Sequence, residues 1–536
     1  MNKNVVLKSV RVIDIENYEP KTETPADYET AIAATGFGLF NILVVLAAMP
    51  IAWAGAFNMS TSAFILASSE CDLELTFLRK GILNSMVYFG MIMSPFFWSF
   101  IMERMNRKAI LMIGLLMDAM CNILCSIIDS YYIFLLFKFI SGTIVSGPYT
   151  LLVPYINEFH SVNYRAKFTT CSGLVFGIGF IIPAALAVIV TPQNWTIEIF
   201  NYVFLSWRIY LMICTLPSII GILTMSLLPE SPKRLIEDGN TSSAHDLLKR
   251  IYQINNWESK HMYPINKLKE DYFEDKKAPS FIPEISQSWN NLKSLFSKPH
   301  LGIFLLINIL HFGSMLAFNT MRLWVPQIYQ IISNFDSSTW EWSKGWPTTC
   351  DYLAMAIIPN KSNSTIYSNP NCVQWKINPS VYVNSTLIAS SAIGFSFLFA
   401  LFYTTRQRKR GVMFFCFVIG ILCGFGTNWG GYVPWMLTQA AIVVVTGRTT
   451  ANIIMSVNNN IIPQNLRTTA TTFVTNIGSF GSIIGNLGFS WLLDFSCLTG
   501  FLSIAIILSV CLLLSVFILQ PEKNKIKNKK QSSTVP

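Results

Sequence analysis

Twelve long apolar runs constrain this chain more than any other feature of its sequence. A helix that crosses roughly 30 Å of hydrocarbon needs about 20 mostly apolar residues, and it must satisfy its own backbone hydrogen bonds because lipid offers none. Runs of this length predict transmembrane helices and an all-α fold. They cover residues 37–57, 81–101, 109–128, 132–152, 168–190, 207–228, 301–320, 385–403, 412–429, 434–457, 468–491 and 498–519.

The composition excludes most other classes of protein. Only 13% of the residues are charged and 52% are hydrophobic, whereas soluble domains carry about 25% charged residues. A soluble enzyme, a disordered chain and a small disulfide-rich secreted module are therefore excluded. Phosphate-binding loops, dinucleotide-binding glycine patterns and clustered Cys/His ligands are absent from the sequence. We predict a multi-pass membrane protein that is not an enzyme and needs neither a metal nor a cofactor.

The distribution of lysine and arginine predicts the orientation of these helices. If both termini are cytoplasmic, the cytoplasmic segments hold 30 of the 39 Lys and Arg residues and the external connections hold six. Cytoplasmic loops are enriched in these residues, so we predict this orientation, in the plasma membrane or a vesicle membrane. The net charge of +10 follows from the same topology and gives no reason to expect nucleic-acid binding.

The connection at residues 326–383 is predicted to lie outside, where disulfides persist. It contains Cys350 and Cys372, which we predict to form a disulfide, while Cys71 has no predicted partner. The remaining cysteines lie within or beside the apolar runs and are expected to be packing residues. We expect N-glycosylation at the external sequons Asn194, Asn360 and Asn363.

Basic residues in the loops reveal an internal repeat. At an offset of 302 residues, Arg104, Arg107 and Lys108 match Arg406, Lys409 and Arg410, and Arg165 matches Arg467. Two loops that agree on one offset indicate two six-helix halves. We predict tails at 1–35 and 520–536, bundles at 36–228 and 301–519, and a cytoplasmic linker at 229–300 that includes a short amphipathic helix near residues 243–255.

Several loop motifs resemble those of the major facilitator superfamily, whose members consist of two six-helix repeats. Residues 99–108 resemble its G-x-x-x-D-R-x-G-R-K motif, and residues 229–234 resemble the P-E-S-P-R motif of sugar and organic-ion transporters. In the second half Thr405 takes the place of Glu103, so the match there is weaker. The resemblance implies gating roles for Glu103, Arg104, Arg107, Lys108, Glu158, Arg165, Glu230, Arg234, Arg406 and Arg467.

Within that superfamily the chain resembles the synaptic vesicle glycoprotein 2 group, especially its insect-type relatives. The resemblance rests on residues 36–41, 69–73 and 323–326. It implies two functions that the sequence leaves open. The chain is either a transporter or a membrane glycoprotein that binds partners through its external loop without transporting.

Four charged or titratable side chains are predicted near the middle of the membrane, where such groups are costly and usually functional. Lys138 and Gly142 resemble the R-x-x-x-G signature of the fourth helix, which implies a role in substrate or proton coupling. The alternative is a structural ion pair between Lys138 and Asp118. His311 is either a proton carrier or a buried packing residue.

Arg448 breaks the repeat, because the offset of 302 residues places Ser146 opposite it. That asymmetry favours substrate recognition, and the alternative is a pairing between helices or hydrogen bonds to backbone carbonyls. Two cations and a histidine against one acid favour an anionic or neutral substrate over a cation. The sequence thus predicts a monomeric transporter of a small organic solute that works by alternating access, with proton coupling and facilitated diffusion both left open.

Overall fold

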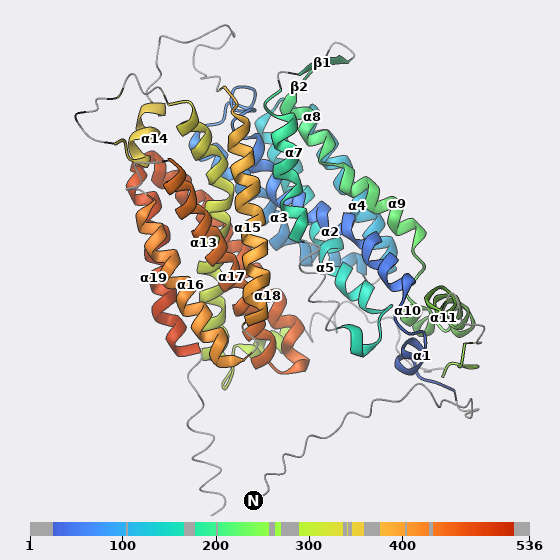
Figure 1. Cartoon of the computed structure of the whole chain (residues 1–536). Coiled ribbons are helices and arrows are strands. Elements are labelled where there is room, and N and C mark those ends of the chain that lie inside the picture. Colours follow the sequence, from blue (N-terminus) through green and yellow to red (C-terminus); the bar gives the residue numbers. More distant parts are fainter. Residues whose placement is uncertain are drawn as a thin grey trace, which may run out of the picture. The chain divides into compact units, whose positions relative to one another are not determined.

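The computed structural model is almost entirely helical (Figure 1). The chain divides into two compact units. The small unit holds Met1–Val44, Ile156–Lys167 and Pro229–Asp275, and the large unit holds the rest of the chain. The structure describes residues 25–102, 105–165, 177–193, 195–199, 202–256, 263–269, 289–335, 340, 343, 346–357, 376–402, 405–427 and 433–518.

The first six predicted runs all contain helix in the described residues. An antiparallel hairpin of two short strands, β1 (Thr196–Ile199) and β2 (Tyr202–Leu205), lies between the fifth and sixth of them. The helices are α2 (Leu39–Ile65), α3 (Phe77–Met102), α4 (Arg107–Ile127), α5 (Tyr131–Asn157), η2 with α7 (Ile178–Phe180, Ile182–Val190) and α8 with α9 (Ser206–Ile213, Leu216–Leu227).

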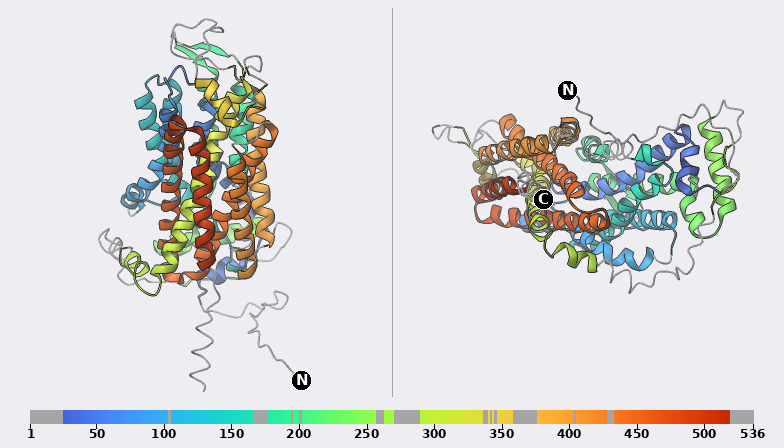
Figure 2. Two further views of the ribbon diagram at one scale, coloured as in Figure 1. Left: turned by 90° about the vertical axis from the view of Figure 1, so that its left-hand side faces the viewer. Right: turned by 90° about the horizontal axis from the view of Figure 1, so that it is seen from below.

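The other six predicted runs form the helices of the second half, which run side by side in the bundle of Figure 2. A short helix, α14 (Thr349–Ile357), precedes α15 in the long connection after α13. The predicted all-α, twelve-helix architecture is confirmed. The six helices are α13 (Leu301–Ser333), α15 (Pro379–Phe402), α16 (Arg406–Gly426), α17 (Val433–Ile461), α18 (Gln464–Phe495) and α19 (Cys497–Ile518).

The repeat is visible in the helix boundaries, since α17 begins at Val433, 302 residues after α5 begins at Tyr131. Nine helices of the described residues are long and apolar enough to cross a membrane on their own. Of the other three, the helix at 178–190 is short, and α3 and α18 pack against each other. A helix that is covered by its neighbours needs less apolar surface than one that faces lipid.

The long helices of the large unit run between two ends. At the hairpin end, α2, α13 and α18 finish and α3 and α15 begin, and the β-hairpin and α14 lie there (Figure 1). At the linker end, α9 finishes and α13 begins.

Charged residues of the loop after α2 are fixed at the hairpin end. Lys80 Nζ lies 2.7 Å from Glu70 Oε2, and Trp207 Nε1 donates to Asp72 Oδ2 at 2.6 Å. Cys71 between these two acids is disulfide-bonded. The stretch at residues 69–73, one of the segments that resemble the vesicle glycoproteins, therefore holds the ends of α2, α3 and α8 together.

The small unit contains α1 (Tyr28–Ala34), α10 (Pro232–Glu237), α11 (Thr241–Asn255) and the first residues of α2. Asn255 Oδ1 accepts from the backbone of Phe40 at 3.0 Å, and Asn255 Nδ2 donates to Asn41 Oδ1 at 3.0 Å. A Cβ at Gly38 would lie 2.8 Å from the backbone of Asn255. Gly38 is thus required for the close approach of α11 to the start of α2.

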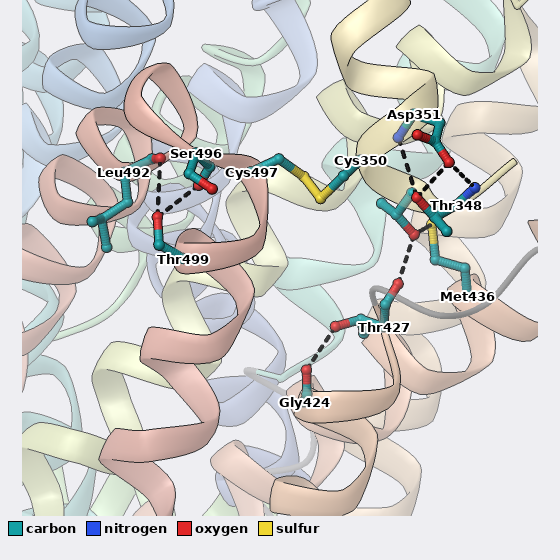
Figure 3. Close-up of a disulfide and its surroundings, with 11 residues drawn as sticks. Thr348, Cys350, Asp351, Gly424, Thr427, Met436, Leu492, Ser496, Cys497 and Thr499 are labelled. Carbon is teal, nitrogen blue, oxygen red and sulfur yellow. Dashed lines mark hydrogen bonds between the residues drawn. A yellow bond between two sulfur atoms is a disulfide. The ribbon is translucent and has the colours of Figure 1, made fainter.

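The predicted disulfide between Cys350 and Cys372 is wrong, because Cys350 is bonded to Cys497 (Figure 3). Cys497 begins α19 and was expected to be a packing residue, but it lies at the hairpin end beside α14. The bond closes a loop of 147 residues. Cys372 and the sequons Asn194, Asn360 and Asn363 lie outside the described residues.

Glycines allow the closest helix crossings. A Cβ at Gly142 of α5 would clash with the backbone of α3, where Val87 Cα would be 2.9 Å away. At the same crossing, a Cβ at Gly90 would lie 2.6 Å from Thr143 N. The glycine of the predicted R-x-x-x-G signature therefore has a packing role, because backbone atoms on both sides leave no room for a side chain.

Gly142→Ala should lower the free energy of unfolding by about 1–3 kcal/mol, because the new methyl group meets backbone that cannot rotate away. Thermal unfolding of the detergent-purified protein measures this. Gly394→Ala is the matched control, since Gly394 of α15 has nothing within 4 Å of its Cβ position. Equal melting temperatures for the two variants would contradict the packing role of Gly142.

Cys350→Ser and Cys497→Ser should each cost about 2–4 kcal/mol of stability, because a disulfide restricts the unfolded chain. The double variant should lose no more than either single variant, since both remove the same bond. Cys423→Ser is the control for stability, because Cys423 is a free cysteine. Non-reducing peptide mapping should find Cys350 linked to Cys497. A peptide that links Cys350 to Cys372 would refute this assignment.

Candidate substrate site

The two halves of the large unit contact each other toward the hairpin end. Tyr382 OH of α15 donates to the backbone oxygen of Phe64 at 3.3 Å, and their ring centroids are 6.3 Å apart. Tyr88 OH of α3 donates to Asn319 Oδ1 of α13 at 3.0 Å. Each of these residues lies in the part of its helix that is nearer the hairpin end. A solute site is expected between the halves, farther from the hairpin end than these contacts.

Asp118 lies inside the first half and is almost completely surrounded by donors. Its Oδ1 accepts from Asn58 Nδ2 at 2.6 Å and from Asn122 Nδ2 at 3.1 Å, and its Oδ2 accepts from Ser218 Oγ at 2.6 Å. Ser141 Oγ is 2.7 Å from Asp118 Oδ1 but equally near Asn58 Oδ1, so its single proton serves one of them. Donors from α2, α4 and α9 suit an ionised carboxylate, which only accepts hydrogen bonds.

Lys138 joins this cluster without touching the carboxylate. Its Nζ donates to Asn122 Oδ1 at 3.2 Å and to Thr61 Oγ1 at 3.4 Å, and its side chain is fully buried. Asn122 therefore bridges lysine and aspartate, donating to Asp118 and accepting from Lys138. The direct ion pair that was one of the two sequence interpretations is not formed between these described residues. The cluster is enclosed by α2, α4, α5 and α9, all of the first half.

Arg448 of α17 lies between the halves. Its guanidinium carbon is 5.4 Å from the ring centroid of Phe318 on α13 and 5.8 Å from that of Phe180 in the first half. Among the described residues it has no hydrogen bond and no ion pair. A Cβ at Gly447 would be 3.1 Å from Phe318 Cβ, so this glycine brings α17 close to α13 and places Arg448 beside the rings.

Arg322 of α13 contacts the same two rings, at 5.4 Å from Phe180 and 5.6 Å from Phe318. Unlike Arg448, it is well bonded to the first half. Its guanidinium donates to Ser60 Oγ at 2.7 Å, to the backbone oxygen of Met59 at 2.9 Å and to Tyr88 OH at 2.9 Å. Arg322 thus holds α13 to α2 and α3.

His311 is buried in α13, and its ring lies against Gly478 of α18. A Cβ at Gly478 would be 2.7 Å from His311 Cδ2, so the glycine makes room for the imidazole. Its Nδ1 is buried and has no hydrogen-bond partner among the described residues. This arrangement agrees with the interpretation of His311 as a buried packing residue.

The predicted gating residues of the large unit occupy three different environments. Lys108 Nζ donates to the backbone oxygen of Leu228 at 2.5 Å and so ties the start of α4 to the end of α9. Lys409, which matches Arg107 at the offset of 302 residues, donates to Ser456 Oγ at 2.8 Å. Arg107 and Arg467 are exposed. Glu103, Arg104 and the side chain of Arg406 lie outside the described residues.

The gating candidates of the small unit are bonded locally. Arg165 donates to the backbone oxygens of Asn157 and His160 at 3.0 and 2.9 Å and forms an ion pair with Glu29 at 2.9 Å. Burial lowers the pKa of the His160 imidazole, which favours its neutral form beside Arg165. The backbone oxygen of Glu158 accepts from Tyr28 OH at 2.5 Å.

The motif that resembles P-E-S-P-R begins α10. Ser231 Oγ accepts from the backbone of Arg234 at 3.3 Å, and Pro232 follows it in the first turn. A serine cap followed by proline is a common helix start. Arg234 Nε donates to Asp238 Oδ2 at 3.0 Å, and Glu230 immediately precedes the cap.

A sequence profile described as "Sugar (and other) transporter" matches residues 38–334, more than half of the chain. The chain belongs to the sugar (and other) transporter family. The curated relatives of this family member include synaptic vesicle glycoprotein 2B of Rattus norvegicus, 26% identical over 336 residues that cover 58% of this chain and 49% of the relative. Synaptic vesicle glycoprotein 2A of the same species is 24% identical, covering 60% and 46%.

These relatives confirm the resemblance to the vesicle glycoproteins, and this transporter-family chain spans about half of their length. Among solved structures it is similar to the partially occluded inward open conformation of the xylose transporter XylE from E. coli. The TM-score is 0.61 with 11% identity, covering 90% of this chain and 100% of that chain. At this identity the similarity concerns the fold, and it confirms the major facilitator architecture.

Sequence reasoning misses three aromatic residues of the site, which are Tyr88, Phe180 and Phe318. The predicted apolar run ends at residue 320 and so leaves out Arg322, whereas α13 continues to Ser333. A usable signal was the spacing of Phe318 and Arg322, four residues apart and so on one face of a helix. No pattern in the sequence predicts that Phe318 and Arg322 lie near Phe180.

Asp118→Asn should lower the free energy of unfolding by about 1–3 kcal/mol, because it turns one acceptor oxygen into a donor that faces other donors. Thermal or denaturant unfolding in detergent measures this. Asp494→Asn is the matched control, since Asp494 is exposed at the end of α18. If Asp118→Asn were as stable as its control, the cluster would not hold the first half together.

Proposed function

We propose that this chain is a secondary transporter that moves a small organic solute across a membrane by alternating access. Its membership in the sugar (and other) transporter family and its fold support the proposal. The observation that carries it is Arg448, a guanidinium with aromatic neighbours but no hydrogen bond or ion pair among the described residues, placed where the two halves face each other. An intramembrane charge is costly unless something compensates it, and a solute that arrives between the halves can do so.

The contacts between the halves define what must move. With both termini cytoplasmic, as the lysine and arginine distribution favours, the hairpin end faces outward and the structure corresponds to a state closed on that side. Opening it requires the loss of the bonds from Arg322 to Ser60, Met59 and Tyr88 and of the Tyr382 contact with Phe64. Solute bound beside Arg448 would then be exposed to the other side of the membrane.

The enclosed cluster of Asp118, Asn122 and Lys138 has a different part in this proposal. Its bonds link four helices of the first half, so that half can rotate as one body. If transport is coupled to protons, Lys138 and His311 remain the candidates, and the coupling would appear as uptake driven by an imposed pH gradient. Uptake that follows the solute gradient alone would indicate facilitated diffusion.

Cross-linking across the halves tests alternating access. In proteoliposomes, Phe64→Cys combined with Tyr382→Cys should lose uptake when a short thiol cross-linker joins them, because the hairpin end can then no longer open. Reductive cleavage of the linker should restore it. Labelled D-xylose, uridine, benzoate and benzylamine serve as probes for sugars, nucleosides, anions and cations.

The matched control is Phe304→Cys with Phe473→Cys, whose rings are 5.5 Å apart within the second half. Cross-linking this pair should leave uptake intact, since neither residue moves relative to the other. Full uptake by the locked Phe64–Tyr382 pair would contradict alternating access. No uptake of any probe by the unmodified protein would favour the binding or regulatory glycoprotein instead.

A further inference from the structure

The site between the halves carries two positive charges and, among the described residues, no acid. Arg322 and Arg448 contact the same two rings, those of Phe180 and Phe318, and neither has a carboxylate within 4.0 Å in the described part of the chain. Asp118 is enclosed by its own donors in the first half, and Asp494 is exposed at the end of α18. The two guanidiniums therefore repel each other in a medium that screens charge poorly.

The two arginines differ in what they can offer a ligand. The terminal nitrogens of Arg322 already donate to Ser60, Met59, Tyr88 and Asn319. Arg322 therefore offers a ligand its charge but few free donors. Arg448 makes no such bonds. The rings of Phe180 and Phe318 lie near its guanidinium, and a ring packed on the face of a guanidinium leaves the in-plane N–H groups available. Those groups form a fork that matches the two oxygens of a carboxylate.

The backbone around Arg448 is fixed on its other faces. Thr450 Oγ1 contacts Ser314 Oγ at 3.1 Å, Thr449 Oγ1 contacts Ser396 Oγ at 3.3 Å, and Gly447 packs on Phe318. With its neighbours held by α13 and α15, residue 448 is directed toward the first half, where Phe180 and Tyr149 lie. The guanidinium is thus positioned before any ligand arrives.

We infer that the solute is an organic carboxylate with an apolar, preferably aromatic, body, whose carboxylate is bound by Arg448 and whose body packs against Phe180 and Phe318. This inference rests on the proposed transport function and specifies its substrate class. The carboxylate neutralises the charge of Arg448 and relieves its repulsion from Arg322. A neutral solute leaves that repulsion in place, and a cation increases it.

Three probes of one shape separate these cases, since benzoate, benzamide and benzamidinium are planar and differ mainly in charge. The larger series of 1-naphthoate, 1-naphthamide and 1-naphthamidinium covers a roomier site. Binding to the full-length, detergent-purified protein is measured by isothermal titration and by the thermal shift at saturating probe. The carboxylates should bind at least about 10-fold more tightly than the matching amides, since a charge-assisted hydrogen bond contributes more than a neutral one.

Variants of the two arginines locate the binding. Arg448→Gln should weaken carboxylate binding by about 10- to 100-fold, and Arg448→Lys should recover part of it, because lysine keeps the charge without the fork. Arg250→Gln, at an exposed arginine of α11, should bind as the unmodified protein does. Size-exclusion profiles and melting temperatures without probe show whether each variant is folded. If Arg448→Gln fails to fold, carboxylate binding is compared between Arg448→Lys and Arg250→Gln, and weaker binding by Arg448→Lys supports the inference.

Amides or amidiniums that bind as tightly as the carboxylates would overturn the inference, as would carboxylate binding that Arg448→Gln and Arg448→Lys leave unchanged. If no carboxylate binds but D-xylose, uridine or benzylamine is taken up by proteoliposomes, the substrate class is wrong and the transport function stands. If no carboxylate binds and no probe is taken up, both proposals fail.

Discussion

The absence of solvent inside a membrane is the constraint on which the rest of this structure depends. Every polar group on the twelve helices must find a partner within the protein or in something that the protein binds. In the first half, Asp118, Asn122 and Lys138 meet this requirement through hydrogen bonds with one another and with Ser218. In the second half, Arg448 has aromatic neighbours but no hydrogen bond or ion pair among the described residues.

Close approach of the helices makes both arrangements feasible. Gly90 and Gly142 let α3 and α5 cross at backbone contact, next to the part of α5 that carries Lys138 and Ser141. In the second half, Gly447 does the same for α17 and α13 and fixes Arg448 beside Phe318. These glycines therefore allow the close helix contacts that lie beside Lys138 and Arg448.

Much of the architecture could be predicted from the sequence, because apolar length and loop charge are properties of each segment alone. The positions of Asp118, Lys138 and Arg448 along their helices could be predicted for the same reason. Their partners could not be predicted, since residue counting gives depth along a helix and not its rotation or its neighbours. Asn122 as the bridge between Lys138 and Asp118 needed α4 and α5 in register. The pairing of Cys350 with Cys497 needed two connections, 147 residues apart, at one end of the molecule.

The repeat shows how two similar bundles have diverged. At an offset of 302 residues, Lys138 corresponds to Ala440 and Arg448 corresponds to Ser146, so each half carries a cation where the other has a small residue. Ala440 and Ser146 are both buried, so a charged side chain at either position would lose its hydration. The first half has built a partner for its cation into its core, and its charge stabilises a rigid body. In the second half the cation lies at the interface between the halves, where the described residues provide aromatic neighbours but no acid within 4.0 Å.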